Sequence, residues 1–293
     1  MHERRGAGRA GGSGLSNSAL KSWYEPRRAA FPWRADPHPY GVLVSEVMLQ
    51  QTQVSRVVPA YLRFLEQFPT PAALAASPLA EVLRAWKGLG YNRRAAALWR
   101  AAGVIVAEHG GVVPSDPAEL ARLPGVGPYT ASAVASFAYG AAIPALDTNV
   151  RRVVARHRLG TSTPSQAEAL RAATAWIDRA DPGGWNAALM DLGREVCRPE
   201  PVCAACPLRR GCRFRTAPAE GGRPGRPAAP FEGSMRQLRG RIVDAVREAP
   251  SVTVAGVAAR WDEPEDRVAA AVAALASDGL VRAGPGGRIR LGN

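Results

Sequence analysis

The stretch Leu123-Pro124-Gly125-Val126-Gly127-Pro128-Tyr129-Thr130-Ala131 places two glycines, two residues apart, between two segments with helical periodicity. Glycine adopts left-handed backbone conformations at little cost, so the stretch predicts a tight hairpin that joins two helices. Glycine also leaves its amide N–H group bare, and the positive end of the second helix would face the same side. An isolated Gly-x-Gly between helices is usually an ordinary turn. In a basic chain, however, the full run favours sequence-independent contact of Gly125 and Gly127 with a DNA backbone.

Composition and charge indicate a folded protein with an anionic partner. The chain has 293 residues, of which 46% are hydrophobic, and a formal net charge of +13. This excess of positive charge predicts a polyanion as the partner. The sequence contains no apolar run of about 20 residues, the length that crosses a bilayer, and residues 1–18 lack the apolar centre of a signal peptide. We therefore expect a cytoplasmic protein that is associated with no membrane.

Helical periodicity dominates residues 18–213, where apolar residues recur at intervals of three and four. Residues 1–17 are rich in Gly, Arg and Ser, which predicts a disordered basic segment. Residues 214–233 are rich in Pro and Gly and predict a linker. Within the helical region we expect helices at 40–56, 59–68, 78–85, 92–108, 117–123, 128–139, 148–158, 165–180 and 184–195.

The segment after the linker, residues 234–293, has a different pattern. Residues 235–249, 253–260 and 264–278 predict three short helices. Two alternating runs around Gly284-Pro285-Gly286-Gly287 then predict a hairpin of two strands. This order predicts a small winged-helix-like α+β module, a kind of module that binds protein as readily as DNA.

Glu46 lies in an apolar stretch, with Val42 and Leu43 one turn before it and Leu49 one turn after it. A carboxyl group between such neighbours is partly desolvated, which raises its pKa and keeps it protonated near neutral pH. Glu46 is therefore a candidate for an acid that hands a proton to a leaving group. The alternative is a glutamate on the solvated face of an amphipathic helix, which is the commoner case for an arbitrary position.

Asp147 follows the apolar segment 143–146 and precedes a predicted helix. Its position indicates that Asp147 or Asn149 caps this helix. Helix amides that donate to a carboxylate lower its pKa, so a capping Asp147 could also stabilise positive charge that develops on a sugar. Glu46 and Asp147 then form an acid and an anion, the pair that cleavage of a glycosidic bond requires.

All the cysteines of the chain fall in the window 197–212, separated by five, two and five residues. Thiols clustered in this way in a cytoplasmic chain predict a metal site rather than a disulfide framework. Zinc and a cubane iron-sulfur cluster both accept four thiolates, so the spacing leaves the metal open. The candidate ligands are Cys197, Cys203, Cys206 and Cys212.

These motifs together resemble a known family. Residues 44–54, the hairpin 123–131, the Asp147 segment and the cysteine window occur in the order of the helix-hairpin-helix DNA glycosylases that carry a four-cysteine iron-sulfur cluster. The resemblance covers residues 18–213. It is greatest to the MutY-type adenine DNA glycosylases, which remove adenine mispaired with 8-oxoguanine or guanine in base excision repair. The motifs Pro32-Trp33-Arg34, Gly88-Leu89-Gly90-Tyr91 and Ala188-Leu189-Met190-Asp191-Leu192-Gly193 fit the same subfamily.

The resemblance implies an architecture, a cofactor and a partner. The fold would be mainly α and two-lobed, with the helix-hairpin-helix at 117–140 and a cluster loop at 197–212. The cofactor would be a [4Fe-4S] cluster with a structural role. The partner would be double-stranded DNA with A:8-oxoG or A:G mispairs, bound by a monomer that could also meet other repair or replication proteins.

The resemblance also assigns roles to individual residues. Glu46 would protonate adenine and Asp147 would stabilise an oxocarbenium-like sugar, with Tyr129 and Asn149 in support. The flipped adenine would lie in a pocket lined by Arg34, Leu49 and Asp191, and Gln51 and Tyr91 would fill or wedge the duplex. A plain phosphate contact is the alternative for Arg34, and aromatic packing is the alternative for Tyr91.

Tyr129 separates two kinds of glycosylase chemistry. Related endonuclease III-type enzymes have a lysine at this position of the hairpin, and its amine attacks the sugar to form a Schiff base. A phenol cannot do this, and neither Lys21 nor Lys87 lies in a matching motif. The sequence therefore predicts a monofunctional enzyme that leaves an abasic site.

Two features depart from the family pattern. The first cysteine spacing is five residues, where the family usually has six, so the loop 198–202 must close more tightly. Longer MutY-type enzymes also carry a Nudix-like domain that helps to recognise 8-oxoguanine, and residues 234–293 are too few for it. Recognition of the opposite base would then depend on the core, on the winged-helix-like module, or on both.

Two other functions compete with adenine excision. One is a sister glycosylase for oxidised pyrimidines or for thymine and uracil mispairs, which Tyr129 and Asp191 disfavour. The other is a non-catalytic iron-sulfur regulator that binds DNA through the winged-helix-like module, and it would bind with sequence specificity.

Overall fold

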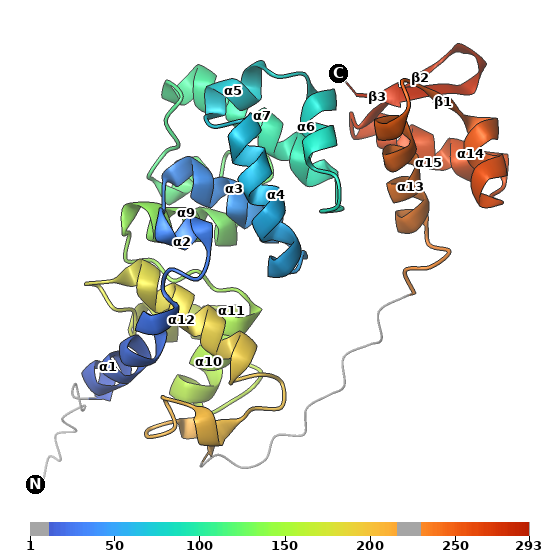
Figure 1. Ribbon diagram of the computed structural model, residues 1–293. Helices are drawn as coiled ribbons and strands as arrows, with labels where there is room; N and C mark the ends of the chain where they lie inside the picture. The colour runs from blue at the N-terminus through green and yellow to red at the C-terminus, as the bar shows by residue number, and fades with distance from the viewer. Residues whose placement is uncertain (1–11, 216–229, 293) are drawn as a thin grey trace, which may run out of the picture. The chain divides into compact units, whose positions relative to one another are not determined.

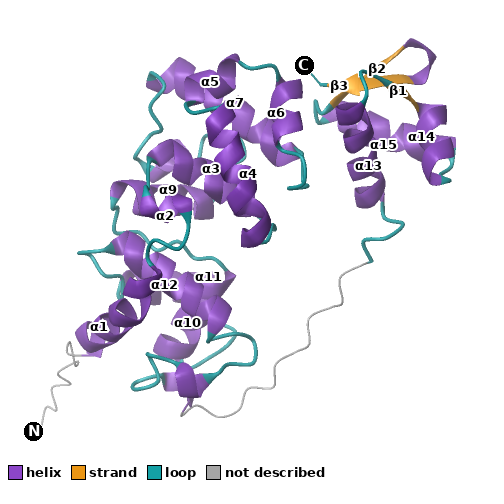
Figure 2. Ribbon diagram, viewed as in Figure 1, coloured by secondary structure: helices purple, strands orange, loops and turns teal. Residues whose placement is uncertain are grey.

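Helices dominate the computed structural model, which describes residues 12–215 and 230–292 (Figure 1). The predicted mainly helical fold is confirmed, and the strands lie near the C-terminus (Figure 2). The described residues divide into two units. The first contains residues up to Pro39 and those from Gly127 to Arg215, and the second contains Tyr40–Val126 and the residues from Pro230 onward. None of the described helices is both long and apolar enough to span a membrane.

The first unit is built around the buried helix α12. Helices α1, α9 and α10 pack against α12, and α11 packs against α10. Their apolar side chains meet in one cluster that includes Leu20, Trp176, Trp185 and Leu192. The helices of this unit are α1 (Gly12–Tyr24), α2 (Pro32–Ala35), α9 (Pro128–Tyr139), α10 (Thr148–Val154), α11 (Gln166–Thr174) and α12 (Pro182–Glu195). Short turns of other helix types occur at Glu25–Arg27, Ala155–Leu159, Cys203–Ala205 and Arg213–Arg215.

Helix α1 corrects the expectation that residues 1–17 are disordered. It begins at Gly12 and carries Leu20 and Tyr24, which are buried in the core cluster of this unit. These two apolar residues are one turn apart, so both lie on the same face of α1 and hold the helix against α12. The rest of the expected basic segment, residues 1–11, lies outside the described residues.

In the part of the second unit before the linker, α5 and α6 pack against α7, and α4 contacts α6. Its core contains Phe64, Phe68, Trp86 and Ile105, all almost fully buried. The ring of Phe64 contacts the rings of Phe68 and Trp86. The helices are α3 (Pro39–Leu49), α4 (Val54–Gln67), α5 (Pro71–Ala76), α6 (Leu79–Ala85), α7 (Arg93–His109) and α8 (Pro117–Leu120).

The expected helix at 40–56 is wrong in its second half. Helix α3 ends at Leu49, and Gln51 has a φ of 58°, in the left-handed region. A new helix, α4, starts at Val54 and continues through Pro59, where the sequence pattern predicted a helix start. A non-glycine residue with positive φ is uncommon, and helical periodicity alone does not reveal it.

The C-terminal part of the second unit has the predicted winged-helix-like order. Three helices are followed by a hairpin, and a short strand before the second helix adds to the sheet, whose order is β1-β3-β2. Both strand pairs are antiparallel, with Val252 opposite Ile289 and Val281 opposite Leu291. The elements are α13 (Met235–Glu248), β1 (Val252–Thr253), α14 (Val254–Trp261), α15 (Glu265–Ser277), β2 (Val281–Gly284) and β3 (Arg288–Leu291). Most of the expected linker, residues 216–229, lies outside the described residues.

Candidate active site and cysteine loop

Asp147 is the N-cap of α10, so the sequence prediction of a cap is confirmed for Asp147. The backbone N–H of Val150 donates to its Oδ1 at 2.6 Å, and Asn149 Nδ2 donates to its Oδ2 at 2.9 Å. These donors favour the ionised carboxylate. Burial nevertheless outweighs them, so the pKa of Asp147 lies above its ordinary value although the amides lower it as expected. Ionisation of the Asp147 carboxyl group therefore costs more free energy here than in water.

Arg152 connects this carboxylate to the cysteine loop. Its Nη2 donates to Asn149 Oδ1 at 2.8 Å and to the carbonyl of Gly193 at 2.6 Å, and its Nε donates to the carbonyl of Cys197 at 2.6 Å. The guanidinium thus fixes the amide of Asn149 so that its N–H group points to Asp147. Sequence reasoning did not find Arg152, because nothing in its spacing separates it from the many other arginines.

Gly193 allows α12 to approach this network. A Cβ atom at position 193 would lie 2.6 Å from Asn149 Cβ and 2.9 Å from Asn149 Cα. Contacts this short do not occur, so any larger residue must displace Asn149. The glycine of the Asp191-Leu192-Gly193 motif therefore has a packing role beside the candidate site.

A second polar residue that the sequence analysis missed holds the segment before Asp147. Asn186 of α12 is fully buried. Its Oδ1 accepts from the N–H of Ala145 at 2.8 Å, and its Nδ2 donates to Ser136 Oγ at 2.9 Å and to the carbonyls of Ile143 at 3.0 Å and Pro182 at 3.1 Å. One amide side chain therefore ties residues 143–145 to α9 and α12.

Arg34 and Asp191, both predicted to line the adenine pocket, contact each other. Arg34 Nη1 donates to Asp191 Oδ2 at 2.7 Å and Nη2 donates to Oδ1 at 3.2 Å. The Asp191 side chain is 2% exposed and also pairs with Arg194 at 3.0 Å. The guanidinium of Arg34 lies over the ring of Phe31 at 5.0 Å. In this arrangement Arg34 is more accessible than the carboxylate that orients it.

Tyr129 lies in the first turn of α9 and is half-buried. Before it, Gly125 has a φ of 79°, and a Cβ atom there would lie 2.6 Å from Ala97 Cβ, so this position of the hairpin requires glycine. Gly127 is exposed and is the N-cap of α9, with Pro128 as the first residue of the helix. A bare amide at the start of a helix suits an anion.

Glu46 lies in the second unit, in an apolar helix. Residues 40–48 of α3 are all buried, and Glu46 itself is 5% exposed. Its neighbour Ser45 satisfies its own hydroxyl by donating to the carbonyl of Val42 at 2.8 Å. Leu49 is half-buried one turn after Glu46. The predicted desolvation of the Glu46 carboxyl group is confirmed.

Gln51 and Tyr91, the two predicted wedge residues, share an unusual backbone. Three described residues other than glycine have positive φ: Gln51 at 58°, Tyr91 at 45° and Asp262 at 53°. Both predicted wedge residues belong to this small set, and both are exposed. Strained backbone in non-glycine residues collects at functional sites, so this geometry independently marks the two positions.

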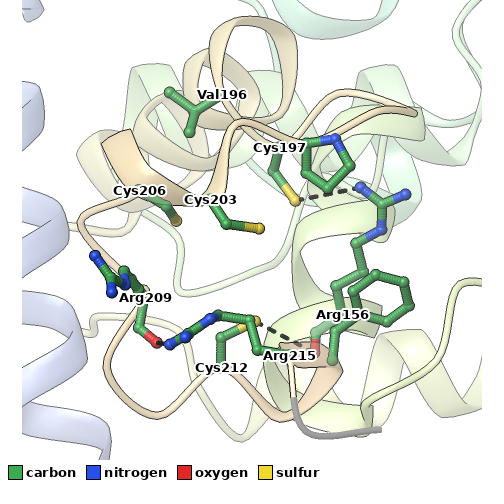
Figure 3. A pocket seen from close by; sticks show the side chains of 10 residues that line it. Arg156, Val196, Cys197, Cys203, Cys206, Arg209, Cys212 and Arg215 are labelled. Carbon is green, nitrogen blue, oxygen red and sulfur yellow. Dashed lines mark hydrogen bonds between the residues drawn. The ribbon is translucent and has the colours of Figure 1, made fainter. Parts of the chain in front are cut away.

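The cysteine side chains surround one cavity (Figure 3). All four are free of disulfides. Arginines lie beside them: Arg156 Nη1 donates to Cys197 Sγ at 3.7 Å and to the carbonyl of Arg198 at 2.6 Å, and Arg209 and Arg215 also line the cavity. Burial, together with the neighbouring cysteines, raises the pKa of Cys206 to about 11. The set therefore offers four thiols, with cationic donors that would offset the charge of thiolate ligands.

The described residues contain no group of three or more His, Cys, Asp or Glu side chains that is already arranged around a single ion. The four cysteines line the same cavity (Figure 3). Four thiols around one cavity fit an iron-sulfur cluster in the number and type of its ligands.

The sequence-predicted residues are shared between the two units. The first unit holds Asp147, Asn149, Tyr129 and the pair Arg34 and Asp191, together with the cysteines. It brings Asn149 to Asp147 and Arg34 to Asp191. The second unit holds Glu46, Leu49, Gln51 and Tyr91.

Comparisons with known proteins agree with these features. Residues 44–179 match the HhH-GPD superfamily of base excision DNA repair proteins. The adenine DNA glycosylase of Mycolicibacterium smegmatis is 43% identical over 283 residues, which cover 94% of this chain and 96% of that protein. Among solved structures, a thermostable thymine-DNA glycosylase has a TM-score of 0.64 at 27% identity, covering 70% of this chain and 97% of its own. A non-covalent endonuclease III–DNA complex has a TM-score of 0.59 at 27% identity, covering 70% and 96%. The chain belongs to the adenine DNA glycosylase family.

Proposed function

We propose that this protein is a monofunctional glycosylase that excises adenine from A:8-oxoG and A:G mispairs in duplex DNA. The observation that carries the proposal is the similarity to an adenine DNA glycosylase over 94% of the chain. The polar network around Asp147 supports it at the level of chemistry. Duplex DNA as the partner is supported by the net charge of +13 and by the DNA complex of the endonuclease III neighbour.

Glu46 acts as the general acid in this proposal. It is 5% exposed and lies within a run of buried residues of α3. Protonation of the extruded adenine makes it a better leaving group, and a positioned acid typically contributes about 100- to 10,000-fold to such a step.

Asp147 acts as the anion that stabilises the oxocarbenium-like sugar. Its oxygens accept from Val150 N–H and Asn149 Nδ2, so the carboxylate has a fixed orientation before substrate binds. Burial raises the free energy of this anion, and a developing positive charge nearby lowers it. The Asp147 carboxylate therefore stabilises the positively charged transition state more than the neutral substrate.

Water, rather than an amine, takes the place of the departing base. The position at the start of α9 holds the phenol of Tyr129. The two lysines of the chain, Lys21 and Lys87, are both exposed, and Lys87 pairs with Glu248 at 3.2 Å. The product is therefore an abasic site without a Schiff-base intermediate.

The four cysteines would hold a [4Fe-4S] cluster. When bound, the cluster would supply a structural cross-link for the loop 197–212, which also contains Arg209, and the reaction would not consume it. Iron and sulfide analysis of aerobically purified protein tests this assignment. A colourless protein with zinc in place of iron contradicts it.

Excision from four duplexes tests the proposed function. Adenine is placed opposite 8-oxoguanine, G, C or T, and alkali then cleaves the strand at abasic sites. We expect breaks at adenine opposite 8-oxoguanine and G alone. Excision of thymine or oxidised pyrimidines would favour a sister glycosylase. Binding without excision, at one preferred sequence, would favour a regulator.

Sodium borohydride trapping tests the monofunctional assignment on the same duplexes. We expect abasic product with little covalent protein–DNA adduct. Efficient trapping at the excised nucleotide contradicts hydrolysis by water.

A further inference from the structure

We propose that Arg94 is a positioning residue that holds the Gln51 turn and the Tyr91 turn together as one rigid wedge. The inference rests on the proposed role of Gln51 and Tyr91 in base extrusion. Arg94 lies in the first turn of α7, two residues after Asn92, the N-cap of that helix. No motif in the sequence singled it out.

The guanidinium of Arg94 donates to both turns. Nη1 donates to the carbonyls of Val47 and Met48, each at 2.8 Å. Nη2 donates to Thr52 Oγ1 at 2.9 Å and to the carbonyls of Leu89 at 3.1 Å and Gly90 at 3.2 Å. These are the last turn of α3, the residue after Gln51 and the two residues before Tyr91. One side chain therefore binds both sides of the proposed wedge.

A planar guanidinium suits this position because its acceptors are backbone carbonyls. The last carbonyls of a helix have no partner within the helix, and a cation there also interacts favourably with the helix dipole. Arg94 satisfies two such carbonyls of α3 and still has a second nitrogen for the other turn. Lysine has one nitrogen and cannot cover both groups in this fork geometry.

The two turns also contact each other and the core. Thr52 Oγ1 donates to the carbonyl of Leu89 at 3.2 Å, and Trp86 Nε1 donates to the carbonyl of Gly90 at 3.1 Å. The guanidinium carbon of Arg94 lies 5.4 Å from the centre of the Tyr91 ring and 5.6 Å from that of Trp86. Left-handed backbone in a non-glycine residue persists only where the surroundings determine it. Arg94 supplies that restraint next to both such residues.

Burial of the charged Arg94 side chain has a free-energy cost, which its hydrogen bonds to the two turns offset. Burial lowers the pKa of Arg94 to about 10, although the group stays charged at neutral pH. Its Nε is buried without a hydrogen-bond partner among the described residues.

Hydrogen–deuterium exchange of the free protein tests the physical claim without reference to catalysis. We expect Arg94→Lys to raise exchange in both turns together, at residues 50–53 and 89–92, by at least about tenfold. Thr52→Val removes one shared acceptor and should have the same effect with smaller size. Arg100→Met is the matched control, because Arg100 is an exposed arginine of the same helix. Unchanged exchange in Arg94→Lys, or a change in one turn alone, overturns the inference.

A double-mutant cycle tests the functional claim. Extrusion is followed by the fluorescence of 2-aminopurine placed in the lesion duplex. We expect Arg94→Lys and Tyr91→Ala each to lower the extruded fraction about tenfold or more, and the double variant to lose clearly less than the product of the two losses, because part of the effect of Arg94 passes through Tyr91. Additive losses overturn the positioning role.

The two tests separate failure of this inference from failure of the proposed function. Exchange is measured without DNA, so it is informative even if the parent protein excises no adenine. If Arg94→Lys is too unstable to purify, Thr52→Val carries both measurements, and its unchanged exchange and extrusion overturn the inference.

Discussion

The two candidate catalytic carboxyl groups lie in very different surroundings. Asp147 accepts hydrogen bonds from Val150 N–H and Asn149 Nδ2. Arg152 in turn donates to Asn149 Oδ1 and so orients the amide of Asn149. Glu46 lies in α3 within a run of nine buried residues. Both groups are desolvated, and at Asp147 the donors Val150 N–H and Asn149 Nδ2 offset part of the free-energy cost of the negative charge. The comparison shows that burial raises the pKa of Asp147 even where two donors favour its ionised form.

Replacement of Glu46 has the largest expected effect. Glu46→Gln keeps the shape and burial of the side chain but removes the transferable proton, so we expect excision of adenine to fall at least about 100-fold. The measurement is single-turnover excision on the A:8-oxoG duplex, with Glu66→Gln as the control because Glu66 is an exposed glutamate of α4. A loss of less than about tenfold would mean that adenine departs without this acid.

Asp147→Asn should lower the rate by about 100-fold and yet leave the fold no less stable. Asparagine is as good an N-cap as aspartate, so α10 keeps its start. The raised pKa of Asp147 means that the folded state holds this proton more firmly than the unfolded state. The parent therefore loses stability as pH rises through the folded-state pKa, and the uncharged variant does not. Thermal melts from about pH 4 to neutrality should show an advantage of the variant that grows with pH.

An advantage that shrinks with pH would contradict this account. It would mean that the donors of α10, and not burial, dominate the free energy of the Asp147 carboxylate. The two melting curves therefore measure whether burial or hydrogen bonding has the larger effect on the pKa of Asp147.

These two environments show what sequence could and could not predict. The cap at Asp147 was predictable, because capping is a local property of an aspartate before a helix. The four thiols were predictable as one set, since no other cysteine competes with them. The sign of the pKa shift of Asp147 was not, because it depends on a balance between burial and hydrogen bonds that only the packed structure reveals.

The roles of two arginines were also not predictable from the sequence. The chain has 38 Lys and Arg residues, so Arg94 and Arg152 carry no local mark that separates them from a solvated charge. Their roles come from carbonyl groups that are distant in sequence, such as Val47 for Arg94 and Cys197 for Arg152. The left-handed turn at Gln51 was missed for a similar reason, since periodicity continued across it.

Gly193→Ala should have an intermediate effect on excision, through the contact between Asn149 and Asp147. The added methyl group would lie 2.6 Å from Asn149 Cβ, so Asn149 or α12 must shift, which disturbs the contact between Asn149 and Asp147. We expect excision to fall about tenfold and stability to fall by about 1–3 kcal/mol, as for overpacking of a filled core. Gly103→Ala in α7 is the control, because a Cβ atom there meets nothing within 4 Å. Full activity of Gly193→Ala would show that the Asn149 amide does not orient the carboxylate.

The smallest effect is expected for Ser136→Ala, because the side-chain amide of Asn186 has more acceptors than N–H groups. Its Nδ2 has two N–H groups and three acceptors within reach, namely Ser136 Oγ, Ile143 O and Pro182 O. Ser136→Ala therefore leaves both N–H groups satisfied and should change excision less than about twofold. Asn186→Ala leaves the buried N–H of Ala145 without its acceptor, which costs about 1–3 kcal/mol of stability. Equal losses from the two substitutions would show that the Ser136 hydroxyl, and not the Ala145 N–H, is the contact that holds the segment before Asp147.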